Sequence, residues 1–303
     1  MSTEQSPQKP PAIRTSVLLF AIIGMIATFG VGWYFASTKN EMIKDTQKRD
    51  RESIAAQIED LKNEKRASLL DYEASDEDLA DLPENLRVRN VYLESTAITD
   101  AGMKHLENLQ GVQHLSLAGT KITDKGLESL KGYTELEEIL LNRTAIRGSG
   151  LKHLTGARRL LELRLRDTNI EDEELEVLKQ FPSLRRLSLR GTRVTNDGMP
   201  AIAQLTNLEE LRLGNTGIND QALESLKPLT KLRRLSLLGT KITDEGLKSL
   251  TGLTELREIL LDETAITDEG LKTLESLPNL HTISIVGTKV TKAGVQSIVS
   301  KGW

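Results

Sequence analysis

A threonine recurs at one fixed interval along most of this chain, and this spacing constrains the fold more than any other feature. Aliphatic residues precede each threonine by eight, five and three positions, and others follow it by two, seven and ten. The interval is 24 residues, as from Thr96 to Thr120. A fixed period of this length is the signature of an array in which each repeat is one supersecondary unit. The threonines in register are Thr96, Thr120, Thr144, Thr168, Thr192, Thr216, Thr240, Thr264 and Thr288.

The apolar spacing changes within each unit. Before Thr192, Leu187 and Leu189 alternate with polar residues, whereas Met199 and Ile202 after it lie three positions apart. Alternation is typical of a strand with one buried face, and the three-residue step is typical of a helix. We therefore expect a short strand followed by a short helix in every unit.

The letters I-T-D often separate the two parts of a unit, and their Asp or Thr is expected to cap the helix by accepting hydrogen bonds from its first N–H groups. Asn196 is an acceptable substitute, whereas Gly148 and Lys292 are not. The aspartates in this place are Asp100, Asp124, Asp172, Asp220, Asp244 and Asp268.

A unit this small cannot bury its own apolar face, so neighbouring units must stack around one continuous core. The pattern L-x-x-L-x-L-x-x-T-x-I-T-D-x-G-L-x-x-L resembles leucine-rich repeats, in particular their cysteine-containing subclass with its ITDxGL helix start. Thr stands where that subclass has Cys, and the period is slightly shorter than the roughly 26 residues of that subclass, within the range for leucine-rich repeats.

The resemblance implies an α/β solenoid, with a parallel sheet on the concave face and short helices on the convex face. We expect it to cover residues 73–303, as a terminal half-repeat followed by nine repeats of equal length, each centred on one threonine. Leu79 and Leu82 place the half-repeat at residues 75–86, where it would act as a cap. The threonines are expected to be structural, with hydroxyls that satisfy backbone groups in the turn after each strand.

A membrane segment is expected before the repeats. Residues 16–36 contain no charged side chain, and a segment of this length is long enough for a helix to cross a bilayer. A cleavable signal peptide is the alternative, although its apolar region would be shorter and would end in small residues. Residues 1–15 are expected to be a disordered tail, and residues 37–72 a charged helical stalk, on which Ile54, Ile58 and Leu61 share one face.

The orientation of this anchor is open from the sequence. Lys39, Lys44 and Lys48 follow the segment with two arginines, while Lys9 and Arg14 precede it, which by the positive-inside rule favours a cytoplasmic repeat domain. A large soluble domain after an N-terminal anchor is more often exported. We expect a single-pass membrane protein whose repeat domain is extracytoplasmic.

The outward face of the strands is where partners are expected to bind, because solenoids present this surface. Residues six positions before each threonine alternate in charge from Glu162 onward and are interpreted as a row of ion pairs. The rows at four and two positions before the threonine carry arginines without acids in those two rows, beside two leucines. Glu162, Glu210 and Asp167 lie close enough to neutralise part of this charge. Arginine's planar fork suits carboxylate or phosphate. The predicted partner-binding residues are Arg164, Arg166, Arg190, Arg212, Leu238 and Leu260.

Enzyme and cofactor functions find little support. The chain has no cysteine and four histidines, none of which pairs with another at metal-ligand spacing. No nucleophile-elbow or phosphate-loop motif is present, and the glycines recur with the repeat as turn residues. The formal net charge of −4 gives no reason to expect nucleic acid as a partner.

The sequence therefore predicts a membrane-anchored, non-catalytic module that binds another protein, possessing no cofactor or metal site. One alternative is a structural protein of the cell envelope that self-associates through its repeats. Another is a cytoplasmic substrate adaptor, by analogy with F-box proteins that carry such repeats.

Overall fold

The computed structural model of the chain describes residues 68–70 and 74–299. The predicted tail, the predicted membrane helix at residues 16–36 and all but the end of the predicted stalk lie outside these residues. Within the described part, no helix has both the length and the apolar character needed to span a bilayer.

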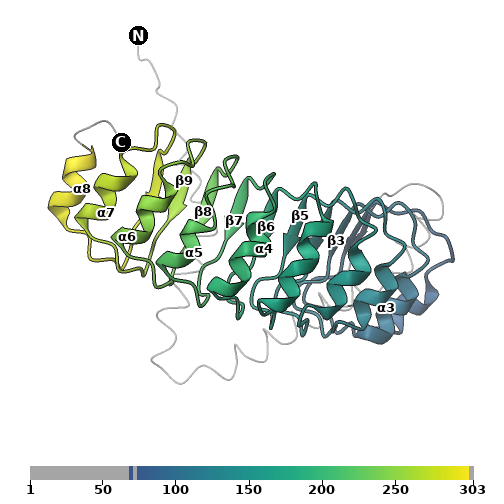
Figure 1. Ribbon diagram of the computed structural model, residues 1–303. Helices are drawn as coiled ribbons and strands as arrows, with labels where there is room; N and C mark the ends of the chain where they lie inside the picture. Colours follow the sequence, from purple (N-terminus) through teal and green to yellow (C-terminus); the bar gives the residue numbers. More distant parts are fainter. Residues whose placement is uncertain (1–67, 71–73, 300–303) are drawn as a thin grey trace, which may run out of the picture. The chain divides into compact units, whose positions relative to one another are not determined.

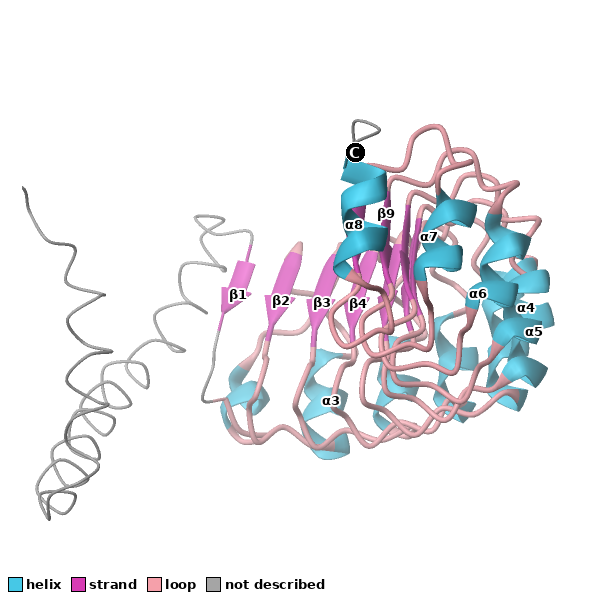
Figure 2. Cartoon of the chain, turned by 90° about the vertical axis from the view of Figure 1, so that its left-hand side faces the viewer, coloured by secondary structure: helices cyan, strands magenta, loops and turns pink. Residues whose placement is uncertain are grey.

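One parallel sheet of ten strands contains the strands in their sequence order (Figure 1). Helices cover the opposite side, so each repeat contributes one strand and one helical segment, as predicted (Figure 2). The strands are β1 Ser68–Leu70, β2 Asn90–Tyr92, β3 His114–Ser116, β4 Glu138–Leu140, β5 Glu162–Arg164, β6 Arg186–Ser188, β7 Glu210–Arg212, β8 Arg234–Ser236, β9 Glu258–Leu260 and β10 Thr282–Ser284.

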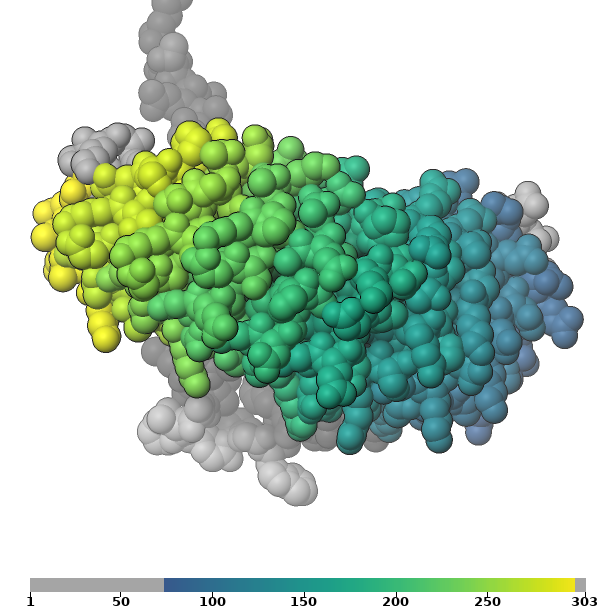
Figure 3. Space-filling model, in the orientation of Figure 1, coloured from purple at the N-terminus to yellow at the C-terminus, as the bar shows by residue number. Residues whose placement is uncertain are grey.

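The helical segments are short, and several are only 3₁₀ turns, because the chain has few residues between one strand and the next. Successive repeats abut one another along this helical side (Figure 3). The α-helices are α3 Asp100–Leu106, α4 Met199–Ala203, α5 Asp220–Glu224, α6 Asp244–Leu247, α7 Asp268–Leu274 and α8 Lys292–Val299. The 3₁₀ helices are η1 Asp78–Asp81, η2 Gly126–Leu130, η3 Ser149–Leu154, η4 Glu173–Gln180, η5 Asn196–Gly198 and η6 Lys248–Leu250.

The sheet begins earlier than the sequence suggests. Strand β1 lies inside residues 37–72, which the sequence analysis assigns to a helical stalk, and it pairs with β2 in parallel. Ser68 pairs with Asn90, an offset two positions shorter than that between Asn90 and His114 in the next pair of strands. The shorter offset hides β1 from a search for the regular period. Leu79 is buried and Leu82 packs against the core, as expected for the terminal half-repeat.

The core is built from the aliphatic positions that the repeat pattern predicts. In the unit of Thr192, Leu187, Leu189, Met199 and Ile202 are each no more than 1% exposed. Equivalent leucines and isoleucines of neighbouring units continue this core along the sheet. Stacking therefore buries what a single unit would expose.

All nine threonines in register make the same hydrogen bond. Each hydroxyl donates to the backbone carbonyl three residues earlier, at 2.5 to 2.9 Å, as Thr192 does to Leu189. Thr192 is 5% exposed, so its hydroxyl satisfies a carbonyl that has little access to water. This is the contact that the sequence predicts for these residues.

Thr192→Ala is expected to lower the free energy of unfolding by about 1 kcal/mol, because the carbonyl of Leu189 loses the hydroxyl donor and keeps only the backbone N–H of residue 192. Thr192→Ser, which keeps the hydroxyl, is the matched control and is expected to lose less. Chemical denaturation of both variants measures this difference, and an unchanged midpoint for Thr192→Ala would contradict the role.

The sequence leaves either the Asp or the Thr of I-T-D as the helix cap, and the structure selects between them. The capping side chain is the threonine, as where Thr243 accepts a hydrogen bond from the N–H of Glu245. The aspartate of most I-T-D segments instead accepts hydrogen bonds from the threonine that caps the helix of the next repeat. Asp220 accepts hydrogen bonds from the backbone N–H and the hydroxyl of Thr243, at 2.7 and 2.6 Å. Aspartate thus holds the cap of the following helix, which reasoning about one helix at a time does not anticipate.

This contact recurs as a ladder, which we call the Asp–Thr ladder. Asp124 accepts backbone N–H bonds in the next repeat instead, and Asn196 accepts one from Asn219. Gly148 has no side chain to offer, and the N–H of Glu171 in the next repeat bonds to Glu174. The full pairs are Asp76–Thr99, Asp100–Thr123, Asp172–Thr195, Asp220–Thr243, Asp244–Thr267 and Asp268–Thr291.

Hydrogen bonds from the backbone and hydroxyl of Thr291 lower the pKa of Asp268 below its ordinary value of 3.8. Because the folded pKa is the lower one, this carboxylate stabilises the fold fully above the unfolded value. Its contribution is lost as the pH falls through the folded pKa.

Asp220→Ala is expected to lower the free energy of unfolding by about 1 kcal/mol or more, because two donors of Thr243 lose their acceptor. Asp197→Ala is the matched control, since Asp197 lies at an equivalent helix start with an exposed side chain. Thermal unfolding of both variants tests this contact, and equal midpoints would show that the ladder contributes nothing.

Candidate functional site

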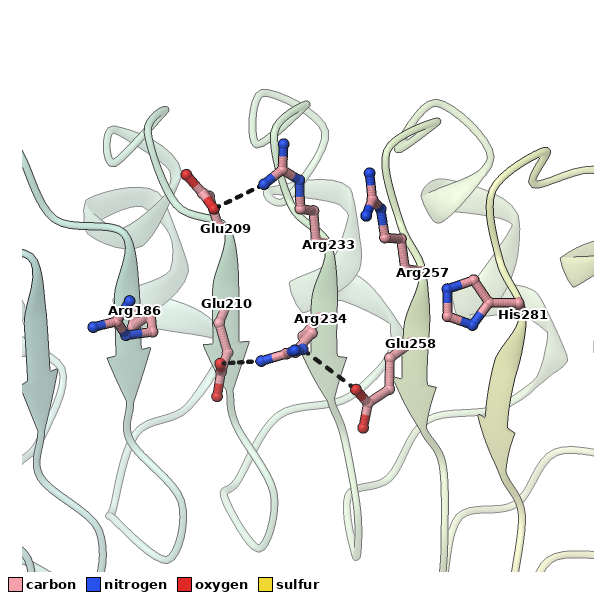
Figure 4. Close-up of a pocket in the computed structure, with 8 residues that line it drawn as sticks. All are labelled: Arg186, Glu209, Glu210, Arg233, Arg234, Arg257, Glu258 and His281. Atoms are coloured by element: carbon pink, nitrogen blue, oxygen red, sulfur yellow. Dashed lines mark hydrogen bonds and ion pairs between the residues drawn. The ribbon is translucent and has the colours of Figure 1, made fainter.

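The outward face of the sheet carries a row of alternating charges, built from the first residue of each strand from β5 to β9. Arg186 pairs with Glu162, and Arg234 pairs with Glu210 at 3.5 Å and with Glu258 at 3.4 Å (Figure 4). The parallel register places these residues side by side. The row of ion pairs predicted from the sequence is present.

Two carboxylates of this row are buried, with side chains only 4% exposed for Glu162 and 10% for Glu210. Each is held by two arginines, one on the neighbouring strand and one two residues later on its own strand. The second partner of Glu162 is Arg164, and that of Glu210 is Arg212, at 2.5 Å. A buried carboxylate needs such compensation for its lost hydration.

The acids that the sequence places near the central arginines do neutralise part of their charge. Arg164 and Arg212 lie two positions after an acid, and residues two apart share one face of a strand. Both are therefore already paired. Arg166 pairs with the adjacent Asp167 at 3.0 Å. Arg190 is half-buried, and its guanidinium has no ion pair or hydrogen bond to any residue that the structure describes.

Four of the six predicted residues line one hollow on the face of strands β6–β9: Arg166, Arg190, Arg212 and Leu260. Arg164 and Leu238 do not line it. Both leucines are only half-buried, whereas the large apolar side chains exposed in the described part are Val286, at 74%, and Val295. The leucines therefore offer less apolar surface than the sequence prediction assumed.

Residues outside the predicted partner-binding set also line this hollow. Ser188 and Ser236 lie on its floor strands, and Glu210, Arg234 and Glu258 come from the alternating row. The sequence could have indicated these residues by their position within the repeat, because the strand register places residues at the same repeat position next to one another. The direction in which each long side chain turns was not available from the sequence.

The hollow contains both charged and hydroxyl groups, and the donors of Arg190 are not used by any described residue. Arg190 offers a planar set of N–H donors, and Ser188 and Ser236 also line the hollow. Within residues 68–70 and 74–299, no group of three or more His, Asp and Glu side chains is placed to hold a metal ion.

The family model described as leucine-rich repeat matches three stretches of the chain, residues 110–131, 204–227 and 229–250. These stretches contain strands β3, β7 and β8 with the threonine turns and helical segments that follow them. The chain is a leucine-rich repeat protein. The other threonine-centred repeats of this leucine-rich repeat protein contribute strands to the same parallel sheet.

Two solved structures from Listeria monocytogenes are similar to this leucine-rich repeat protein. Internalin C2 is 28% identical, over 72% of this chain and 84% of that chain, with a TM-score of 0.49. The internalin inlF is 19% identical, over 74% and 86%, with a TM-score of 0.41. At TM-scores below 0.5, neither similarity supports a statement about partners. No curated protein matches the sequence.

Proposed function

We propose that this leucine-rich repeat protein is a membrane-anchored, non-catalytic interaction module whose strand face binds an acidic segment of another protein. The observation that carries the proposal is Arg190. It is half-buried in the hollow of strands β6–β9, and the acids around it pair with other arginines. An arginine of this kind favours a carboxylate supplied from outside.

The rest of the hollow suits a protein partner. The side chains of Arg166 and Arg212 remain 49% and 46% exposed, although each has one acid partner. Leu260 adds an apolar contact beside them. Arginine is enriched among the residues that dominate binding energy at protein interfaces.

A photo-crosslinking residue placed at position 238, on the strand face, is expected to capture a partner in native membranes. The same residue at position 251, on the helical side, is the control and is expected to capture none. Arg190→Glu is expected to lower the yield at position 238 about tenfold, since a charge-assisted pair becomes a repulsion.

Arg143→Glu makes the same change of charge at an exposed arginine that does not line the hollow. It is the matched control for Arg190→Glu and is expected to leave the yield unchanged. Equal losses in the two variants would attribute the effect to net charge and would contradict a specific contact at Arg190.

The anchor is proposed to be residues 16–36, with the repeat domain outside the cytoplasm. The support is the uncharged length of this segment in the sequence. Protease added to intact cells is expected to remove a C-terminal tag. Protection of the tag until the cells are permeabilised would place the repeats in the cytoplasm and would favour the adaptor alternative.

Self-association of stacked repeats is the less favoured alternative because the Asp–Thr ladder closes at both described ends. At one end, the N–H and hydroxyl of Ser75 bond to Asp78 within the same repeat. At the other, Lys292 stands in the acceptor's place and has no lone pair to offer a following repeat. A head-to-tail stack would therefore lack this contact.

A further inference from the structure

A second row of polar side chains, four of them charged and the last a histidine, lies at the residue before each of the strands β6 to β10, next to the alternating row. Backbone hydrogen bonds join the residues of this row on adjacent strands. The carbonyl of Arg233 accepts hydrogen bonds from the N–H groups of Arg257 and Glu258, at 2.9 and 3.0 Å. The carbonyl of Arg257 likewise accepts those of His281 and Thr282, both at 3.1 Å. Arg233, Arg257 and His281 therefore follow one another at the spacing of adjacent strands, about 4.8 Å.

The acids of this region are used by other arginines. Glu209 pairs with Arg185 at 3.0 Å and with Arg233 at 3.1 Å. Glu258 turns to Arg234 at 3.4 Å. The guanidinium of Arg257 has no acid partner among the described residues, and Figure 4 shows it standing between Arg233 and His281.

His281 lies beside this arginine on the neighbouring strand (Figure 4). Its ring Nδ1 is 3.1 Å from the hydroxyl of Thr282, which orients the ring and leaves Nε2 without a partner among the described residues. Arg257, His281 and Arg233 line a hollow of about 360 Å³. The guanidinium groups of Arg233 and Arg257 repel each other, and a bound anion would relieve that repulsion.

The two hollows adjoin on the sheet. Glu210, Arg234 and Glu258 line both the hollow that contains Arg190 and the one that contains Arg257. An extended acidic segment bound at the first would therefore pass close to the second. Arg190 and Arg257 are the arginines that remain unpaired at the two places.

We infer that Arg257 and His281 form a second carboxylate-binding site, which takes another acidic side chain of the same extended segment. The partner's identity as an acidic protein segment rests on the proposed function. The guanidinium of Arg257 supplies two parallel N–H donors, which match the two oxygens of one carboxylate, and Nε2 of His281 stands beside them.

A labelled hexa-aspartate peptide is the probe, titrated at low ionic strength into the full chain in detergent and followed by fluorescence anisotropy. Arg257→Gln is expected to raise the Kd about tenfold, and His281→Ala by less. Arg257→Lys, which keeps the charge and loses the fork, is expected to lie between wild type and Arg257→Gln. The control is Arg185→Gln, which removes the same charge from the same row where the arginine is already paired.

Equal effects of Arg257→Gln and Arg185→Gln would overturn the site, because only net charge would then matter. Weakening by Arg190→Gln without weakening by Arg257→Gln would overturn it while leaving the proposed function standing. The reverse pattern would support the second site and count against the hollow of Arg190. No binding of the peptide to the wild-type chain, or competition by inorganic phosphate but not by acetate, would overturn the carboxylate assignment.

Discussion

The rest of this structure depends on one constraint, the constant sequence offset between paired strands. The offset is the same from Asn90 to His114 as from Glu162 to Arg186. It sets every side chain beside the residue at the same position of the next repeat. A choice of residue at one position therefore acts along a whole row and not only at one place. The buried threonines, the Asp–Thr ladder and the charged rows all follow from this geometry.

The sequence predicts much of this, because period and apolar spacing are properties of the chain itself. The strands, the helical side, the buried leucines and the threonine hydroxyls follow from it. What it misses involves contacts between repeats. Capping rules consider one helix, so they assign Asp220 to its own helix rather than to Thr243. The sequence positions of Glu210 and Arg212 show that the two residues share one face of the strand, but they do not show that the side chains form an ion pair. Strand β1 escapes because its offset to β2 is shorter than the regular period.

The electrostatics of the strand face also depend on individual ion pairs, which the total numbers of acidic and basic residues do not show. The chain has 40 Lys and Arg against 44 Asp and Glu, which suggests nothing about a binding surface. Glu162 and Glu210 are buried and each takes up two guanidinium groups, which offsets the loss of hydration. This selective pairing leaves Arg190 and Arg257 as groups with unused hydrogen-bonding capacity. The distribution of acids, rather than the number of arginines, determines where an anion is favoured.

The glycine at position 148 has a consequence for how the array comes apart. Stability in stacked repeats is close to a sum over nearest-neighbour interfaces, so one weaker interface lowers the cooperativity between the segments on either side. Between the repeats of Thr144 and Thr168, the sheet and the core continue but the ladder does not. Partial opening would begin at this boundary, and the two segments would behave as separate cooperative units before the whole array unfolds.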